Sequence, residues 1–251
     1  MKNFCFTVDD NIRFFREISE RGCGSIFEHP YLDMYRRLHE KYGLKIQLNL
    51  FYEDEKFNLS EIPDRYRDEW AGCADWLKLS FHSRRENVRP YELSGYGEVF
   101  EDCRRVHGEI LRFASDESLA KTTTLHYCLA TAEGIDALRD NGVKGLLGLY
   151  GASPSYQNTP DECERINEGE TVISGGIAYA KIDVIMNKYS KDQILERLSG
   201  LCGRELIKIM IHEQYFYPDY PRYQPDFEEK IDAALALLKE NGYESSFWED
   251  L

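Results

Sequence analysis

The chain has 251 residues and carries 31 lysines and arginines against 45 aspartates and glutamates, which gives a formal net charge of -14. Such a charge repels the phosphates of nucleic acids and of anionic lipid surfaces, so neither nucleic acid nor membrane is expected as a partner. With 42% hydrophobic and 30% charged residues, the composition is that of a folded globular protein and excludes the disordered and membrane-spanning classes.

The amino terminus and the cysteines predict a reduced, cytoplasmic setting. The apolar run at residues 1–8 is too short for a secretory signal peptide and leads directly into acidic residues. The seven cysteines are odd in number and form no CxxC pair, so most are expected to be buried free thiols. Nothing in the sequence decides between a monomer and a homo-oligomer.

Short apolar runs alternate with segments of helical periodicity, a pattern typical of βα units around a parallel sheet. Seven runs are predicted as strands, at residues 4–8, 44–51, 76–81, 122–128, 143–150, 177–186 and 206–212. A further run at 245–248 either completes the ring of strands or caps it. Seven strands favour one distorted (β/α) barrel, forming a single domain over residues 1–251, rather than a small open sheet.

Apolar residues at helical spacing predict helices at residues 31–42, 99–113, 190–201 and 226–241. Gly43 follows the first as a stop signal, and Ser190 opens the third with a capping-box pattern that Gln193 completes. Two stretches without clear periodicity, about 53–69 and 152–171, are predicted as loop insertions. Each follows a strand, so both should project from the carboxyl-terminal face of the barrel, where active sites lie.

Several predicted strands carry, or end in, a residue that can bind a metal ion or transfer a proton. These residues are Asp9, Asp10, His82, His126, Asp183, His212 and Glu213. Taken singly, each has an ordinary structural explanation, such as a helix cap, a hydrogen-bonded core histidine or a salt bridge. Because the carboxyl ends of barrel strands surround one pocket, we expect these side chains to converge there.

The residue types in this set suit metal-assisted hydrolysis. Imidazole nitrogen and carboxylate oxygen are natural ligands of zinc and similar divalent ions. A bound ion lowers the pKa of its water to about 7 and polarises an acyl oxygen. A nearby carboxylate can then accept the water proton, and a histidine can protonate the leaving group. The inventory therefore predicts cleavage of an amide or an ester.

Three of these segments resemble the motifs of one known family. Residues 6–11, Phe-Thr-Val-Asp-Asp-Asn, resemble the Thr-Phe-Asp-Asp-Gly motif on strand one of the polysaccharide deacetylase (NodB-homology) superfamily. Residues 79–83, Leu-Ser-Phe-His-Ser, resemble its histidine motif on strand three, and residues 209–213 resemble its late Leu-x-His motif. The resemblance spans nearly the whole chain.

The resemblance implies a distorted barrel of about seven strands that removes N- or O-acetyl groups from sugars with a divalent metal, expected to be zinc. Carried over residue by residue, it implies that Asp9 is the general base and His212 the general acid. It also implies that Asp10 and His82 are metal ligands.

The sequence departs from the family pattern at two positions. Glu86 stands where the His-x-x-x-His motif has its second histidine, and Asn11 replaces a glycine. Glu86 could still bind the metal, because carboxylate oxygen binds zinc at about the same distance as imidazole nitrogen. His126 could instead complete the site, and we favour it because it supplies the missing imidazole without depending on a loop.

The adjacent carboxylates impose a condition on the backbone. Successive side chains of a strand point to opposite faces, so Asp9 and Asp10 cannot both enter the pocket from a regular strand. We expect the chain to bend at Asn11, a residue type that tolerates unusual backbone angles.

The leading hypothesis is a metal-dependent hydrolase that deacylates a carbohydrate or a related small amide or ester, with Asp183, Glu86, Tyr127 and Glu213 contacting the substrate. One alternative is a degenerate, carbohydrate-binding barrel without turnover, suggested by Glu86. Another is a metal-independent glycosidase with paired carboxylates such as Asp9 and Asp183. Residues 87–91 and the aromatic series at 215–223 are expected at the mouth, where they either stack on sugar rings or pack on one another.

Overall fold

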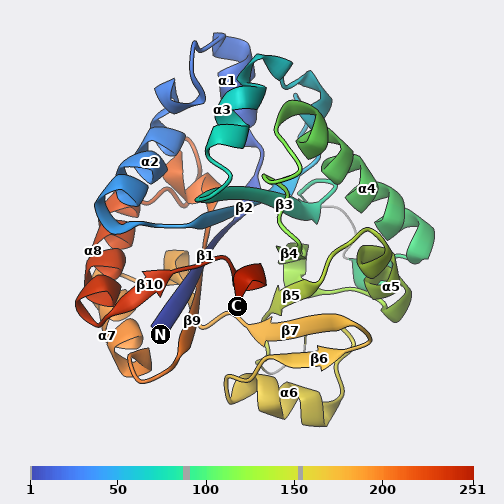
Figure 1. The fold of residues 1–251 in the computed structure, drawn as a ribbon, viewed down its shortest axis with the longest axis vertical. Coiled ribbons are helices and arrows are strands. Elements are labelled where there is room, and N and C mark those ends of the chain that lie inside the picture. The colour runs from blue at the N-terminus through green and yellow to red at the C-terminus, as the bar shows by residue number, and fades with distance from the viewer. Residues whose placement is uncertain (1, 87–90, 152–154) are drawn as a thin grey trace.

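A ring of strands forms the centre of the computed structural model, which describes residues 2–86, 91–151 and 155–251 (Figure 1). The strands of the ring are β1 (Lys2–Asn11), β2 (Ile46–Phe51), β3 (Leu77–Ser83), β4 (Thr122–Thr123), β5 (Gly145–Gly148), β7 (Ile177–Lys181) with its continuation β8 (Val184–Ile185), and β9 (Leu206–His212). Their hydrogen bonds divide them into two sheets, ordered β3-β2-β1-β9-β8 and β4-β5-β7-β6. The short β6 (Val172–Ser174) pairs antiparallel with β7.

Two seams join these sheets into a distorted barrel. At one seam, a parallel bridge links Leu79 of β3 to Leu119 just before β4. Polar side chains inside the barrel reinforce it, since Ser80 Oγ and Gln47 Nε2 both donate to the carbonyl of Thr122. At the other seam, the chain itself passes from β7 in one sheet to β8 in the other. The predicted barrel of about seven strands is confirmed.

Helices cover the outside of the ring, with α2, α7 and α8 on one side and α4 and α5 on the other (Figure 1). The helices are α1 (Arg13–Arg21), α2 (Pro30–Tyr42), α3 (Arg67–Gly72), α4 (Tyr96–Phe113), α5 (Ala132–Asp140), α6 (Pro160–Asn167), α7 (Lys191–Leu201) and α8 (Phe227–Glu240). Gly43 ends α2 in the left-handed conformation, and Ser190 and Gln193 form the predicted capping box of α7. All six residues of β2 are buried, as expected for a strand covered on both faces.

Some elements differ from the sequence prediction. Strand β4 has only two residues, and the chain leaves it before reaching His126. Within the predicted insertion 152–171, helix α6 begins with a capping box of Thr159 and Glu162, while residues 152–154 lie outside the described part. The closing run begins as β10 (Tyr243–Ser245), which pairs with the first residues of β1 and so caps the amino end of the barrel.

Strand β1 contains a bulge at the two adjacent aspartates. Val8 pairs with Leu48 and Asn11 with Leu50, so Asp9 and Asp10 together stand opposite the single residue Asn49. Asp10 has a φ of 65°, in the left-handed region. An extra residue of this kind lets neighbouring side chains point to the same face. The expected bend is therefore present, but at Asp10 and not at Asn11.

Asn11 holds the bulge in place. Its side chain is fully buried and donates to the carbonyls of Val8, at 2.6 Å, and Asn49, at 3.0 Å. Its Oδ1 accepts a hydrogen bond from the hydroxyl of Tyr31 at 2.9 Å. An amide can make all three bonds because it has both donors and an acceptor. A glycine, which the family motif has here, could make none of them.

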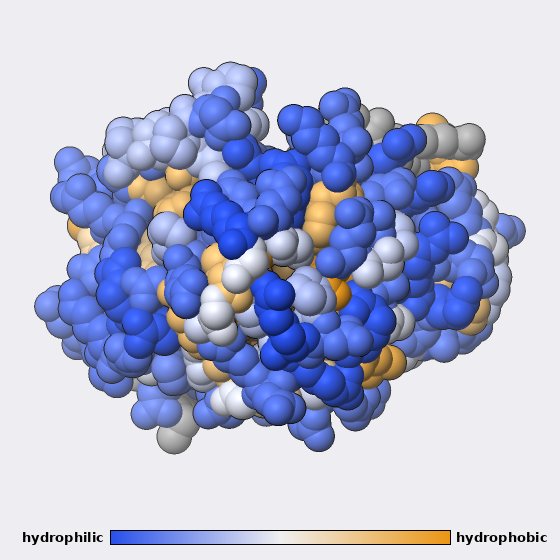
Figure 2. Space-filling model, turned by 90° about the horizontal axis from the view of Figure 1, so that it is seen from above, coloured by the Kyte–Doolittle hydropathy of each residue, from blue (hydrophilic) through white to orange (hydrophobic). Residues whose placement is uncertain are grey.

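The helices and one face of the molecule show how apolar residues are distributed in the described ranges. None of the helices in those ranges is both long and apolar enough to cross a bilayer. The face of the molecule in Figure 2 is mostly hydrophilic, and its hydrophobic residues form small separate areas.

Replacing Asn11 tests the role of its side chain in the bulge. Asn11→Ala should lower the free energy of unfolding by about 3 kcal/mol, because it leaves buried backbone carbonyls and the Tyr31 hydroxyl without partners. Tyr31→Phe, which removes only one of the three bonds, should cost about 1 kcal/mol. Urea denaturation measures both, and an Asn11→Ala variant as stable as the parent protein would contradict this assignment.

Candidate metal centre

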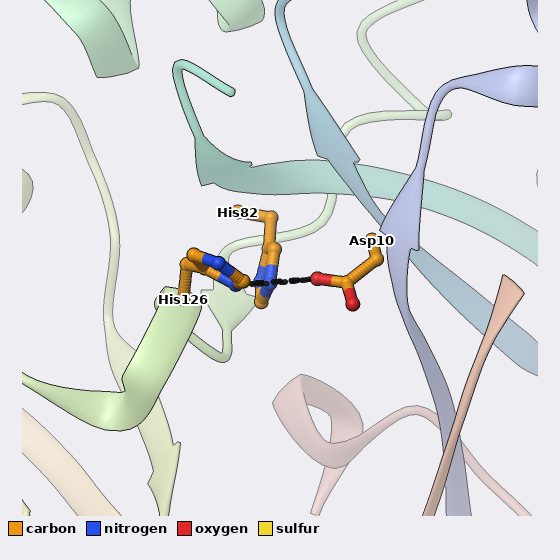
Figure 3. A group of neighbouring side chains, drawn as sticks. All are labelled: Asp10, His82 and His126. Carbon is orange, nitrogen blue, oxygen red and sulfur yellow. Dashed lines mark hydrogen bonds and ion pairs between the residues drawn. The ribbon is translucent and has the colours of Figure 1, made fainter. Parts of the chain in front are cut away.

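Three side chains from different strand ends point toward one another at the carboxyl end of the barrel (Figure 3). Asp10 comes from the bulge in β1, His82 from β3, and His126 from the turn that follows β4. Asp10 Oδ1 lies 3.0 Å from His82 Nε2 and 3.2 Å from His126 Nδ1, and the two ring nitrogens are 3.2 Å apart. Asp10 and His82 are buried, and His126 is partly buried.

The spacing of these three atoms fits a tetrahedral metal ion. Bonds of 2.0–2.1 Å to zinc place neighbouring ligand atoms roughly 3.3 Å apart. The 3.0 and 3.2 Å separations approach this value, and one carboxylate with two imidazoles is a donor set that zinc accepts. Three protein ligands leave the fourth position for water or substrate, as catalytic zinc sites do.

Neighbouring groups orient the first two of these residues. His82 Nδ1 lies 2.5 Å from the carbonyl oxygen of Thr124, which can only accept, so Nδ1 carries a hydrogen and a neutral ring directs its Nε2 lone pair into the cluster. Gln214 Nε2 donates to Asp10 Oδ2 at 2.7 Å, which leaves Oδ1 facing the imidazoles. Partners of this kind fix the direction of metal ligands and raise their affinity.

A strained turn brings His126 into the cluster. The next two residues, Tyr127 and Cys128, both have left-handed φ values, of 64° and 56°. These values reverse the chain immediately after β4 and leave the His126 ring 5.1 Å from the ring of Phe51. Non-glycine residues adopt this conformation only where the surrounding structure requires it.

Asp9 and His212 lie beside the cluster on adjacent strands. They are register partners in the β1–β9 pairing, and both line a cavity of about 210 Å³ with His82 and His126. Asp9 is buried and accepts a hydrogen bond from Asn49 Nδ2 at 2.7 Å. His212 Nδ1 is paired with Asn187 Oδ1 at 2.8 Å, which leaves its other nitrogen available for proton transfer.

The pKa values of Asp9 and Asp10 are shifted in opposite directions. Burial raises the pKa of Asp9, although His82 and His212 partly oppose it. Burial would also raise the pKa of Asp10, but His126 and His82, which donate hydrogen bonds to its carboxylate when their rings are protonated, hold it well below its usual value. The pKa of His82 is raised because, despite burial, Asp9 and Asp10 favour its charged form. The negative charge of Asp9 and Asp10, which favours a proton on His82, also favours a metal cation at the same place. The cation and the proton therefore compete for this site.

Two of the predicted substrate-contacting residues border the centre. Glu86 is exposed and lines a second cavity, of about 480 Å³, together with Asp10, but it does not join the group of converging ligand atoms. Tyr127 is 52% exposed and lines the smaller cavity, with its ring 4.1 Å from that of His126. Of the two possible third ligands, the structure brings His126 and not Glu86 to the cluster.

The other two predicted substrate-contacting residues, Asp183 and Glu213, bind other parts of the chain. Asp183 lies at the start of β8, where its carboxylate accepts hydrogen bonds from Arg204 Nη1 and from the backbone N–H of Lys208. Lys208 precedes His212 by four strand residues, roughly 13 Å, so Asp183 lies about that far from the strand ends, toward the amino end of the barrel. Sequence alone could not show this, because the chain changes sheets immediately before β8.

Glu213 lies beneath the centre and not in it. Its carboxylate is fully buried and accepts hydrogen bonds from the backbone N–H groups of Ile12, Arg13 and Phe14 and from the hydroxyl of Tyr217. It therefore caps the first turn of α1, whose own capping residue, Ile12, has no polar side chain. Burial raises the pKa of Glu213 to about 7 despite these bonds.

The aromatic series near the mouth packs mainly on itself and on the core. The ring of Tyr215 lies 5.1 Å from that of Tyr220, and Phe216 packs on Tyr31. Tyr223 is the most exposed of the series at 39%. Of the loop expected at 87–91, residues 87–90 lie outside the described part, and Tyr91 is buried.

Four supporting residues were not predicted from the sequence. They are Asn49, Thr124, Asn187 and Gln214, which contact Asp9, His82, His212 and Asp10 respectively. Asn49 had a usable signal, because a polar residue in the mainly apolar strand 46–51 needs a partner inside the barrel. Thr124 acts through its backbone carbonyl, which no side-chain pattern reveals.

Comparisons with known proteins agree with this architecture. No family model and no curated protein matches the chain. Among solved structures, it is similar to a 4-alpha-glucanotransferase from Thermococcus litoralis, with a TM-score of 0.65 and 13% identity over 99% of this chain and 40% of that one. It is also similar to a CE4 family pseudoenzyme from Bacillus anthracis, with a TM-score of 0.53 and 12% identity over 100% of this chain and 65% of that one.

A third similar structure is a peptidoglycan N-acetylglucosamine deacetylase in complex with a hydroxamate-type benzamide, with a TM-score of 0.51 and 14% identity over 99% of this chain and 86% of that one. The chain has the polysaccharide deacetylase fold. The three sequence motifs predicted this fold, and the similar structures confirm it, although the sequence itself is divergent. The chain spans less than two thirds of the glucanotransferase and of the pseudoenzyme. Because one fold hosts several chemistries, the activity must be argued from the site.

Glu213→Gln tests whether Glu213 has a structural role. Each carboxylate oxygen accepts two donors, so the amide NH₂ would face two N–H or O–H groups and the free energy of unfolding should fall by about 3 kcal/mol. Zinc content at saturation should be unchanged. The exposed Glu205→Gln is the matched control, and equal stability of the two variants would contradict the capping role.

The choice between His126 and Glu86 can be decided by metal analysis. His126→Ala should lower zinc affinity at least about tenfold, because it removes one of three ligands. Glu86→Ala should bind zinc with the affinity of the parent protein. Titration against a competing chelator measures both, and the reverse order of effects would show that Glu86 is the third ligand.

Proposed function

We propose that this protein is a metal-dependent hydrolase that removes an acetyl or other acyl group from a carbohydrate or a related small amide or ester. The observation that carries the proposal is the convergence of Asp10, His82 and His126 beside the cavity that Asp9 and His212 line. These are the groups that such a hydrolysis requires: three metal ligands, a carboxylate and an imidazole. The fold shared with a peptidoglycan N-acetylglucosamine deacetylase supports the same class of substrate.

The residues divide the proposed reaction among them. A divalent ion, for which we propose zinc, would be held by Asp10, His82 and His126, and would polarise the acyl oxygen and lower the pKa of water. Asp9, oriented by Asn49, would accept the proton of the attacking water. His212, held by Asn187, would donate a proton to the departing oxygen or nitrogen.

The position of Asp9 supports its role as a base and not as a fourth ligand. The bulge separates it from Asp10, and its hydrogen bond goes to an amide instead of to an imidazole of the cluster. A carboxylate bonded to a neutral partner keeps lone pairs free for a proton. His212 lies across the β1–β9 pairing, so base and acid stand on neighbouring strands.

A non-catalytic, carbohydrate-binding barrel is the second candidate, because Glu86 replaces a motif histidine and a CE4 pseudoenzyme has the same fold. The presence of His126 in the cluster argues against it, since the imidazole is supplied from the turn that follows β4. A glycosidase using Asp9 and Asp183 is disfavoured, because Asp183 contacts Lys208, four strand residues or roughly 13 Å below the partner of Asp9, whereas such pairs need a separation of about 5–10 Å.

Acetate release from acetylated amino sugars tests the proposed function. The zinc-loaded protein should release acetate, and a chelator should abolish the reaction. Asp9→Asn and His212→Asn should each lower kcat about 100-fold, as expected for loss of a general base or acid, while zinc content stays stoichiometric. Full activity in Asp9→Asn would contradict the assignment of the base. A zinc-loaded protein that hydrolyses no acylated substrate would favour the non-catalytic alternative.

A further inference from the structure

The smaller cavity at the metal centre is larger than an acetyl group requires. It has a volume of about 210 Å³, whereas a water-sized group such as a methyl occupies roughly 30 Å³. Its walls beyond the proposed catalytic residues are mainly apolar and include Leu125, Cys128, Leu149, Ile185 and Met210, with Tyr127 and Lys188 as the other members. The acetyl methyl, the reacting carbonyl and the attacking water would each take a share of about this size, and the volume that remains is enough for an acyl chain of several carbons.

The two cavities on either side of the cluster suit the two halves of an acylated substrate. The larger one, of about 480 Å³, is bordered by charged side chains that include Arg13, Glu53 and Asp54, and a hydroxylated leaving group would find hydrogen-bond partners there. The smaller one has hydrocarbon walls on which an acyl chain can pack. Asp10 borders the first and His126 the second, so the scissile carbonyl would lie between them.

One cation stands at the smaller cavity. Lys188 follows β8 in a short turn and is the one lysine or arginine among the described residues that line this cavity. It is exposed, and its ammonium group makes no hydrogen bond or ion pair with the described part of the chain. Most other cations near the centre are already paired, as Arg13 is with Asp219 and Arg16 with Asp54.

We propose that this cavity selects an acyl group of about four carbons that ends in a carboxylate, with Lys188 binding that carboxylate. The proposal rests on the hydrolase function proposed above. In the reaction, water forms a bond to the acyl carbon, the bond from that carbon to the leaving oxygen or nitrogen breaks, and the leaving group takes a proton. The products are a dicarboxylate and a free alcohol or amine, and no further reactant is needed.

Acetyl, butyryl and succinyl esters of one fluorogenic alcohol test the preference. Butyryl and succinyl chains have the same length and differ only in the terminal carboxylate, so their ratio isolates the role of charge. The zinc-loaded protein should hydrolyse the succinyl ester with the highest kcat/KM. Lys188→Met should lower kcat/KM for this ester about fivefold, mainly through KM, because an exposed ion pair contributes up to about 1 kcal/mol. The butyryl ester should be unaffected.

Calorimetric binding of succinate and butyrate gives a second measurement that does not depend on turnover. Succinate should bind more tightly than butyrate to the parent protein, whereas Lys188→Met should bind the two ligands with equal affinity. The control is Lys239→Met, which replaces an exposed lysine on α8 and should bind both ligands as the parent does. A preference for acetyl, or an unchanged preference in Lys188→Met, would overturn the inference and leave the hydrolase function standing. If no ester is hydrolysed, the proposed function fails and the succinate titration alone decides the inference.

Discussion

The bulge in β1 is the constraint on which the whole centre depends. In a regular strand, Asp9 and Asp10 would face opposite sides, and one carboxylate would be lost to the layer between barrel and helices. The extra residue turns both inward, and the three hydrogen bonds of Asn11 stabilise the distortion from within the core. The same bulge aims Asp10 at two imidazoles and Asp9 at an amide, so backbone geometry assigns the two carboxylates different chemical environments.

Backbone strain in this protein is concentrated around the centre. In the described ranges, the non-glycine residues with left-handed φ are Asp10, Tyr127, Cys128 and Tyr156. The first three carry or follow a proposed metal ligand, and the hydroxyl of Tyr156 accepts a hydrogen bond from the N–H of Leu125, next to His126. Each such residue costs on the order of 1–3 kcal/mol, which the surrounding packing must offset. The destabilising backbone conformations therefore lie mainly next to the proposed metal ligands.

Sequence reasoning predicted the barrel well, because hydrophobic runs and helix caps are local signals. All seven strand positions were found, and four helices were placed correctly. The sequence also suggested His126 as a ligand. The turn that contains His126 was, however, predicted to be part of a strand. The contacts of Asp183 and Glu213 with Lys208 and with the first turn of α1 were not foreseen, because they are tertiary contacts that periodicity does not reveal. The bend was predicted for a geometric reason, and only its position was wrong by one residue.

The central claim is that Asp10, His82 and His126 bind one metal ion while Asp9 does not. X-ray absorption spectroscopy of the zinc-loaded protein, compared with the Asp9→Asn variant, tests it most directly. We expect two imidazole nitrogens and one carboxylate oxygen at about 2.0–2.2 Å, with the same spectrum in both proteins. A coordination shell with a single imidazole, or one that changes when Asp9 is replaced, would contradict it.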